Sequence, residues 1–312
     1  MPVLILIILL IATPWLFFYV LWRMKFKKSP GVTIPILAFH QVTDRFDWSI
    51  TRQKVHQFER GIRFLYAQGY RSVSLEEMFK SESGFIEPDD EYDKRKVALT
   101  FDDGYEDFYR NAFPILQKYD FTACIFVVTG HIGKESDWDY GWGRYRKKHL
   151  SWQQIQELSD SGFIFGSHTV NHPDLTKIPK QFIEYELKSS KETLEDKLDK
   201  RVDLLSYPFG RYNRSVQQVA ERLGYKRAYT LCSNSRINGF DPWAQERMGV
   251  YLLDSPLTLK IKLNQGKLFW IEDMKSWIIN RFPGWTIILK GKPNYDKLNT
   301  ESCPERIHLK VS

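Results

Sequence analysis

Two adjacent carboxylates follow an apolar segment of the chain. Asp102 and Asp103 come directly after the run ALTF and are followed by Gly104. At the end of a strand, neighbouring side chains point to opposite sides, so one carboxylate can ligate a metal ion while the other faces a substrate water. Asp-Gly is also a common turn dipeptide, and a turn without a chemical role is the alternative interpretation. The pair alone does not decide between the two.

Two histidines stand four residues apart further along the chain. His168 and His172 have the spacing that puts two imidazoles on one face of a helix or helical turn. Thr169 stands where zinc proteases with this spacing carry their glutamate, so a base would have to come from elsewhere. Asp102 or Asp103 could be that base and the other the third ligand, which gives an open Asp-His-His site. The alternative is a hydrogen-bonded surface turn.

Strand-like apolar runs alternate with amphipathic segments, which indicates an α/β fold. Seven runs are expected to be buried parallel strands, at 33–39, 96–101, 122–128, 163–167, 202–207, 227–231 and 247–253, and helices are expected at 51–68, 151–161, 179–199 and 213–223. This is the size of one (β/α) barrel, whose active site collects at the carboxyl ends of the strands. A closed barrel would therefore bring His40, the two aspartates, the two histidines and residues 208–210 to one rim.

The composition excludes disorder and gives no sign of a nucleic-acid binder. Of 312 residues, 43% are hydrophobic and 27% charged, so the chain can bury a substantial core. The formal net charge is +7, and four of the positive charges lie within residues 1–30, so no basic stripe is left for a polyanion. The three cysteines are too scattered for a disulfide framework or a cysteine-based zinc site, and Cys124 and Cys232 are expected in the core.

Residues 2–22 are uncharged over 21 positions, enough for a helix rising about 1.5 Å per residue to cross a hydrocarbon layer of roughly 30 Å. We expect a transmembrane anchor over 1–22, since a cleaved signal peptide would have a positive start and a small-residue cleavage site. A basic linker (23–32), one α/β domain (33–290) and a C-terminal tail (291–312) would follow. The positive-inside rule would place the domain in the cytoplasm.

Two further features lie outside the strand ends. Residues 267–285 are amphipathic, and a helix there would put Trp270, Met274, Trp277 and Ile278 on one face. We expect this face to cover the core, with a membrane-interface helix as the alternative. The remaining histidines are expected to be solvated; they are His56, His131, His149 and His308.

Three motifs taken together resemble the polysaccharide deacetylase family, carbohydrate esterase family four. They are Thr100-Phe101-Asp102-Asp103-Gly104, then His168-Thr169-Val170-Asn171-His172-Pro173, then Tyr207-Pro208-Phe209-Gly210. The resemblance covers residues 33–253. It implies a distorted (β/α) barrel in which Asp102 is the general base and Asp103, His168 and His172 are ligands of a divalent metal ion. The backbone N–H of Phe209 would help to bind the oxyanion.

The sequence departs from most of the family at two places. Ser206 stands where most members carry an arginine that pairs with the catalytic aspartate. We expect Arg247, at the start of the last predicted strand, to reach the aspartate loop and supply that charge. Most members also carry their catalytic histidine after the other motifs. Here His40, after the first strand, resembles the order in the poly-N-acetylglucosamine deacetylases, and we expect it to be the general acid, with a satisfied core histidine as the alternative.

The resemblance implies hydrolysis of N-acetyl groups on an acetylated amino-sugar polysaccharide or lipid-linked glycan. Amide hydrolysis needs a nucleophile, a stabilised oxyanion and a proton for the amine, which metal, carboxylate and histidine can supply. The ligand set suits zinc, with cobalt, nickel or iron also compatible. The alternatives are a metallohydrolase acting on a lipid-linked phosphate and a non-catalytic glycan-binding relic. The resemblance favours an extracytoplasmic, membrane-anchored enzyme, against the basic cluster after the span.

Overall fold

The computed structural model describes residues 34–46, 49–79, 95–136, 146–231, 241–266 and 268–281. The predicted transmembrane segment, the basic linker and the C-terminal tail lie outside these residues, as do Cys232 and Cys303. Among the residues described, no helix has the length and apolar character needed to cross a bilayer. The anchor over 1–22 therefore stays a prediction.

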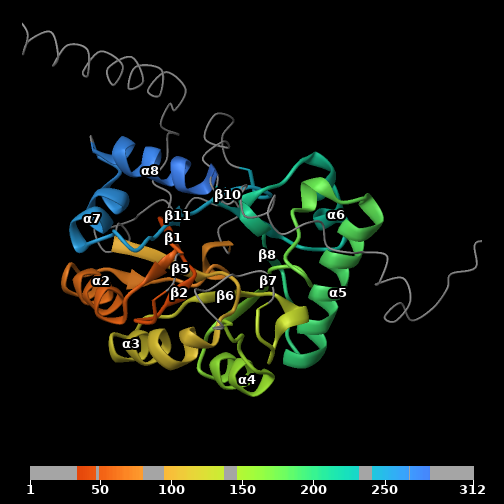
Figure 1. Cartoon of the computed structure of the whole chain (residues 1–312), viewed down its shortest axis with the longest axis horizontal. Helices are drawn as coiled ribbons and strands as arrows, with labels where there is room; N and C mark the ends of the chain where they lie inside the picture. The colour runs from red at the N-terminus through yellow and green to blue at the C-terminus, as the bar shows by residue number, and fades with distance from the viewer. Residues whose placement is uncertain are drawn as a thin grey trace, which may run out of the picture.

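Eight parallel strands form a ring at the centre of the molecule, with helices around it (Figure 1). Across the sheet the strands are β10 (Gln245–Glu246), β9 (Arg227–Thr230), β8 (Leu204–Ser206), β7 (Ile164–Ser167), β6 (Cys124–Val127), β5 (Lys96–Phe101), β1 (Ile36–Phe39) and β11 (Met248–Gly249). The short strand β4 (Arg71–Ser72) also pairs with β5, and β2 (Gln41–Val42) pairs with β3 (Arg52–Gln53).

The two edge strands show that the sheet curls into a near-barrel. β10 and β11 lie at opposite ends of the strand order, yet only Arg247 separates them in the chain. Seven steps across a flat sheet would span about 34 Å, whereas the chain from Glu246 to Met248 reaches only about 7 Å. The edges must therefore lie close together, with Arg247 at the seam. The predicted (β/α) barrel is thus confirmed as a parallel near-barrel.

The helices surround the strands as the sequence pattern predicts. They are α2 (Val55–Ala67), α3 (Phe113–Lys118), α4 (Trp152–Asp160), α5 (Lys180–Leu198), α6 (Arg214–Arg222), α7 (Pro256–Asn264) and α8 (Phe269–Arg281), with short helical turns at Glu77–Phe79, Phe108–Ala112, Thr129–His131, Leu175–Lys177 and Pro208–Gly210. Polar caps fix several helix starts: the Ser151 hydroxyl accepts the backbone N–H of Gln154, and Asn213 accepts that of Val216. The four helices expected from the sequence are α2, α4, α5 and α6.

Aromatic rings fill the space between the sheet and the helices. Phe39 of β1 stacks on Phe101 of β5 with ring centroids 5.1 Å apart, and Phe58 of α2 and Phe108 pack edge-on against Phe101. Burying such large apolar surfaces supplies much of the driving force for folding. This cluster lies beneath the ends of β1 and β5, so it supports the loops that follow both strands.

Three expectations from the sequence are corrected. The run 247–253 holds only β11, because the chain crosses the barrel seam at Arg247 and turns after Val250. Among the side chains of α8 that the structure describes, Glu272, Asp273 and Ile279 are buried, while Ile278 is 41% exposed, so the expectation that Ile278 covers the core is wrong. His149, expected to be solvated, is buried because its segment pairs with Tyr105.

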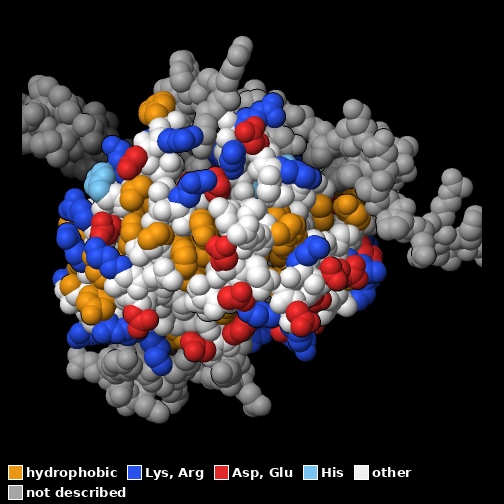
Figure 2. All heavy atoms as spheres, turned by 90° about the horizontal axis from the view of Figure 1, so that it is seen from below, with side chains coloured by type: hydrophobic (Ala, Val, Ile, Leu, Met, Phe, Trp, Pro, Cys, Tyr) orange, Lys and Arg blue, Asp and Glu red, His pale blue; other side chains and the backbone are white. Residues whose placement is uncertain are grey.

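The surface seen from below carries charges of both signs. Figure 2 shows lysine and arginine side chains intermixed with aspartate and glutamate, with apolar side chains between them. Such mixing is usual for a protein face in contact with water.

Candidate active site

The carboxyl end of β5 presents the two aspartates through a tight turn. The backbone N–H of Asp102 donates to Phe39 O at 2.9 Å, which ties this turn to the end of β1. Asp103 and Gly104 both have positive φ, 71° and 70°. A Cβ at Gly104 would lie 2.7 Å from Val127 Cγ1, so only glycine fits here without displacing its neighbour. FDDG therefore forms a turn, and both its carboxylates are buried. The turn conformation alone does not exclude a chemical role for them.

The two histidines meet through a loop and not through a helix. Thr169 and His172 have φ of 70° and 54°, which no helical turn allows, so the expected helical placement is wrong. The rings of His168 and His172 nevertheless have centroids 4.8 Å apart. The loop between them is closed by the backbone N–H of His172, which donates to Thr169 Oγ1 at 2.9 Å.

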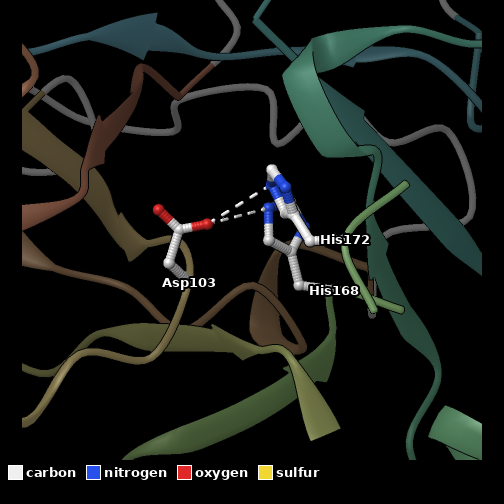
Figure 3. Close-up of side chains that lie close together, drawn as sticks. All are labelled: Asp103, His168 and His172. Atoms are coloured by element: carbon white, nitrogen blue, oxygen red, sulfur yellow. Dashed lines mark ion pairs between the residues drawn. The ribbon is translucent and has the colours of Figure 1, made fainter. Parts of the chain in front are cut away.

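Asp103, His168 and His172 form a compact group of potential metal ligands (Figure 3). Asp103 Oδ1 lies 3.5 Å from His168 Nε2 and 3.4 Å from His172 Nε2. A tetrahedral ion with bonds of about 2.1 Å holds its ligands about 3.4 Å apart, so both distances from Asp103 Oδ1 fit such an ion. The three ligand atoms all lie within 4.8 Å of one another. His168 Nδ1 lies 2.8 Å from the carbonyl oxygen of Ser206, which can only accept, so Nε2 is left with its lone pair.

Burial lowers the pKa of His168, although the charge of Asp102 opposes this shift. The ring is therefore neutral at neutral pH, which a metal ligand requires. The two distances from Asp103 Oδ1 and the neutral ring of His168 thus both fit a bound divalent cation.

Arg247 reaches across the barrel interior to the other aspartate. Its Nη1 donates to Asp102 Oδ1 at 2.7 Å and its Nη2 to Asp102 Oδ2 at 2.6 Å. The same Nη2 donates to Ser206 Oγ at 2.8 Å, so Ser206 contacts the ion pair although its hydroxyl carries no charge of its own. Burial acts to raise the pKa of Asp102, but the Arg247 guanidinium, aided by His168 and His40, holds this pKa well below its ordinary value. Asp102 is therefore a carboxylate at neutral pH.

His40 and Phe209 complete the rim. His40 directly follows β1, is half-buried, and lies near enough to Asp102 for its charge to lower the pKa of that carboxyl. The Phe209 ring packs edge-on against the His172 ring with centroids 4.6 Å apart. Phe209 has φ of 58°, an uncommon conformation for a bulky residue, and its loop is held by Thr230, whose hydroxyl donates to Gly210 O at 2.7 Å. The side chains predicted to form the active site thus lie around one rim.

One residue that shapes the site, Glu186, was not predicted from the sequence. Glu186 of α5 is fully buried and accepts the backbone N–H groups of Val170 and Asn171 at 2.9 and 2.8 Å. Its other oxygen accepts the Asn171 side-chain amide at 2.8 Å. The carboxylate thereby holds the loop that carries both histidines. A glutamate on the apolar face of α5, between Ile183 and Leu187, was the available signal.

Comparisons with known proteins agree with this geometry. The polysaccharide deacetylase family description matches residues 89–228. The Bacillus subtilis protein YxkH, named as a polysaccharide deacetylase, is 29% identical over 204 residues, covering 65% of this chain and 66% of that protein. The poly-beta-1,6-N-acetyl-D-glucosamine N-deacetylase of Staphylococcus aureus is 28% identical over 184 residues, or 56% and 59% of the two chains. The chain thus spans about three fifths to two thirds of the length of these relatives.

A solved structure extends the similarity to about three quarters of the chain. The Streptococcus pyogenes deacetylase PplD, solved in complex with acetate, is 30% identical, with a TM-score of 0.63 over 74% of this chain and 97% of that one. The resemblance seen in the three motifs is confirmed, and the chain belongs to the polysaccharide deacetylase family.

Proposed function

We propose that this chain is a metal-dependent deacetylase that hydrolyses N-acetyl groups on a glycan containing N-acetylhexosamine and releases acetate. The observation that carries the proposal is the position of the Asp102–Arg247 pair beside the Asp103, His168 and His172 group, at one end of one barrel. A base held ionised next to a cation site is what amide hydrolysis by water requires. The poly-N-acetylglucosamine substrate class is suggested by the Staphylococcus aureus relative and by the position of His40.

Each residue has one task in the proposed reaction. Asp103, His168 and His172 hold the cation, which when bound acidifies water and polarises the acetyl carbonyl. Asp102 takes a proton from the attacking water while the water oxygen bonds to the acetyl carbon. The backbone N–H of Phe209 donates to the carbonyl oxygen as negative charge develops there. The carbon–nitrogen bond then breaks, His40 gives its proton to the departing amine, and acetate leaves.

The ion pair at the seam removes the main reason for considering a non-catalytic relic. That alternative rested on the arginine absent at Ser206, and Arg247 supplies an equivalent charge from the position between β10 and β11. Zinc is the metal we expect, with cobalt, nickel or iron compatible with the same ligands. We further propose that residues 1–22 anchor the enzyme, with its domain on the extracytoplasmic side.

Acetate release from an acetylated glucosamine oligomer tests the proposed function. The full chain should release acetate, a chelator should abolish the release, and added zinc should restore it. Asp102→Asn is the matched control, since it removes the base and leaves the three ligands in place. Release that survives the chelator, or that is equal in the Asp102→Asn variant, would refute the proposal.

A further inference from the structure

The segment 253–281, which contains α7 and α8, turns its acidic side chains inward and exposes several aliphatic ones. Its acidic residues, Asp254, Glu272 and Asp273, are all at most 7% exposed. Its exposed large hydrophobic side chains are Leu253 (71%), Leu257 (67%), Leu268 (54%), Ile271 (41%) and Ile278 (41%). A helix that faces water normally shows the reverse pattern.

A buried ionic network holds the acidic groups inside. Lys262 of α7, 1% exposed, donates to Asp254 Oδ2 at 2.6 Å and lies 3.4 Å from Glu272 Oε2. Lys275 of α8 pairs with the same two carboxylates. Turning α8 about its axis would separate Glu272 from Lys262 and leave buried charges unpaired, which is costly, so this arrangement fixes which way α8 faces. Its outward face is thus set by the fold and is not a consequence of a loosely placed helix.

The outward face is aliphatic and carries no exposed acid. Ile271 and Ile278 stand two helical turns apart on α8, so they share one face, and Leu268 precedes Ile271 by one turn. Leu257 lies in the first turn of α7, which packs against α8. The face in Figure 2 differs, since acidic and basic side chains alternate there. Several exposed aliphatic side chains on adjoining helices mark an interaction surface.

A basic hollow adjoins this face. It lies between α2 and α7, has a volume of about 280 Å³, and is lined by Lys260 and Arg95 together with Phe64 and Leu263. Lys260 is exposed on the outer side of α7. Two cations beside an aliphatic surface match an anionic lipid headgroup above acyl chains.

The position of the chain start favours a bilayer as the partner. β1, which begins at Ile36, pairs with β11, and β11 leads directly into the segment 253–281. The uncharged stretch 2–22 is joined to this domain by the ten residues 23–32, which span at most about 35 Å. We propose that the outward face of α7 and α8, with the Lys260–Arg95 hollow, rests on an anionic phospholipid bilayer.

Fluorescence quenching in vesicles tests this proposal on the full chain. In a background of Cys232→Ser and Cys303→Ser, a new cysteine is introduced at Ile271→Cys or Leu257→Cys and labelled with an environment-sensitive dye. Cys124 is left in place because it is 2% exposed inside β6. Lys188→Cys on α5 is the control, because its side chain is 56% exposed and α5 lies across the barrel from α7 in Figure 1. The labelled chains are placed in vesicles of phosphatidylcholine and phosphatidylglycerol that contain a quencher on the acyl chain.

We expect at least twofold quenching at positions 271 and 257 and none at 188. Replacing phosphatidylglycerol with phosphatidylcholine, or introducing Lys260→Glu, should reduce that quenching. Three results would overturn the proposal: no quenching at 271 and 257, a blue-shifted dye that lipid does not quench, or energy transfer between chains labelled at 271, which indicates a second copy. No step measures acetate release, so failure here is separate from failure of the proposed function.

Discussion

The guanidinium of Arg247 and the carboxylate of Asp102 form a two-pronged ion pair inside the barrel, with N–O distances of 2.7 and 2.6 Å. Arg247 is the single residue between the two edge strands. The same position therefore links the edges of the barrel and keeps the catalytic base Asp102 ionised. Its guanidinium also lies over the rings of Phe126 and Tyr229, 5.2 and 5.9 Å from their centroids. These contacts fix the arginine where it can hold Asp102 ionised.

Arg247→Lys should lower turnover and move the acid limb of the pH–rate profile to higher pH. Lysine offers a point charge in place of the bidentate fork, so the pKa of Asp102 rises toward its ordinary value and the base is protonated at higher pH. Arg247→Ala should have the larger effect and also lose roughly 3–5 kcal/mol of stability, because the buried carboxylate loses its partner. pH–rate profiles and urea unfolding measure both. An unchanged profile in the lysine variant would remove Arg247 from the catalytic pair.

The meeting of the aspartates and histidines at one rim could be predicted from sequence, because each group follows a parallel strand and such strands end at a common edge. The way the histidines meet could not be predicted. It depends on left-handed residues at Thr169 and His172 and on hydrogen bonds to Glu186, which belongs to another element. The inward position of Glu272 on α8 could not be predicted for a similar reason: its partner Lys262, and Asp254, which pairs with Lys262 and Lys275, lie before the helix begins.

Variants of the two adjacent aspartates should differ in how much metal they bind. Asp103→Asn should lose both bound metal and activity, since it removes the anionic ligand of the group in Figure 3. Asp102→Asn should keep the metal and lose turnover, because Asp102 pairs with Arg247 and not with the histidines in their ligand positions. Metal analysis of the two purified variants measures this difference. Equal metal loss in both variants would show that the roles are wrongly assigned.

Glu186 should act as a positioning residue for the histidine loop. Glu186→Ala removes the acceptor of two backbone N–H groups, so His172 loses its fixed position and metal affinity should fall roughly 10- to 100-fold. Glu186→Gln should recover most of this affinity, since its amide oxygen can accept the same two groups. Glu184→Ala, on the same helix but paired with surface Arg222, is the control. Chelator competition measures affinity. A loss of thermal stability with unchanged metal affinity would leave Glu186 a purely structural residue.

The buried carboxyl group of Asp107 should make the free energy of unfolding fall as the pH rises. Burial raises the pKa of Asp107 to about 7, although backbone hydrogen bonds and the charge of Lys147 oppose the shift. Between about pH 4 and 7 the folded chain keeps a proton that the unfolded chain releases. The free energy of unfolding should therefore fall by up to about 1.4 kcal/mol per pH unit from this group.

Asp107→Asn cannot release that proton and provides the comparison. Urea unfolding of both proteins at pH 5, 6 and 7, in one detergent, should show wild type losing stability relative to the variant as pH rises. A difference that stays constant across this range would mean that Asp107 is ionised throughout.

His40→Ala should remove proton donation to the departing amine and leave metal binding and folding intact. His40 follows β1, near Asp102 but outside the group of potential ligands formed by Asp103, His168 and His172, so the variant should keep its metal and its fold. The departing amine of a glycan amide needs a proton, and losing a placed donor costs roughly 10²- to 10⁴-fold in rate. An activated ester has a leaving group that departs without a proton, so its hydrolysis should fall far less. Equal slowing of both substrates, or a fall in metal content, would show that His40 holds the site together and that the proton comes from another group.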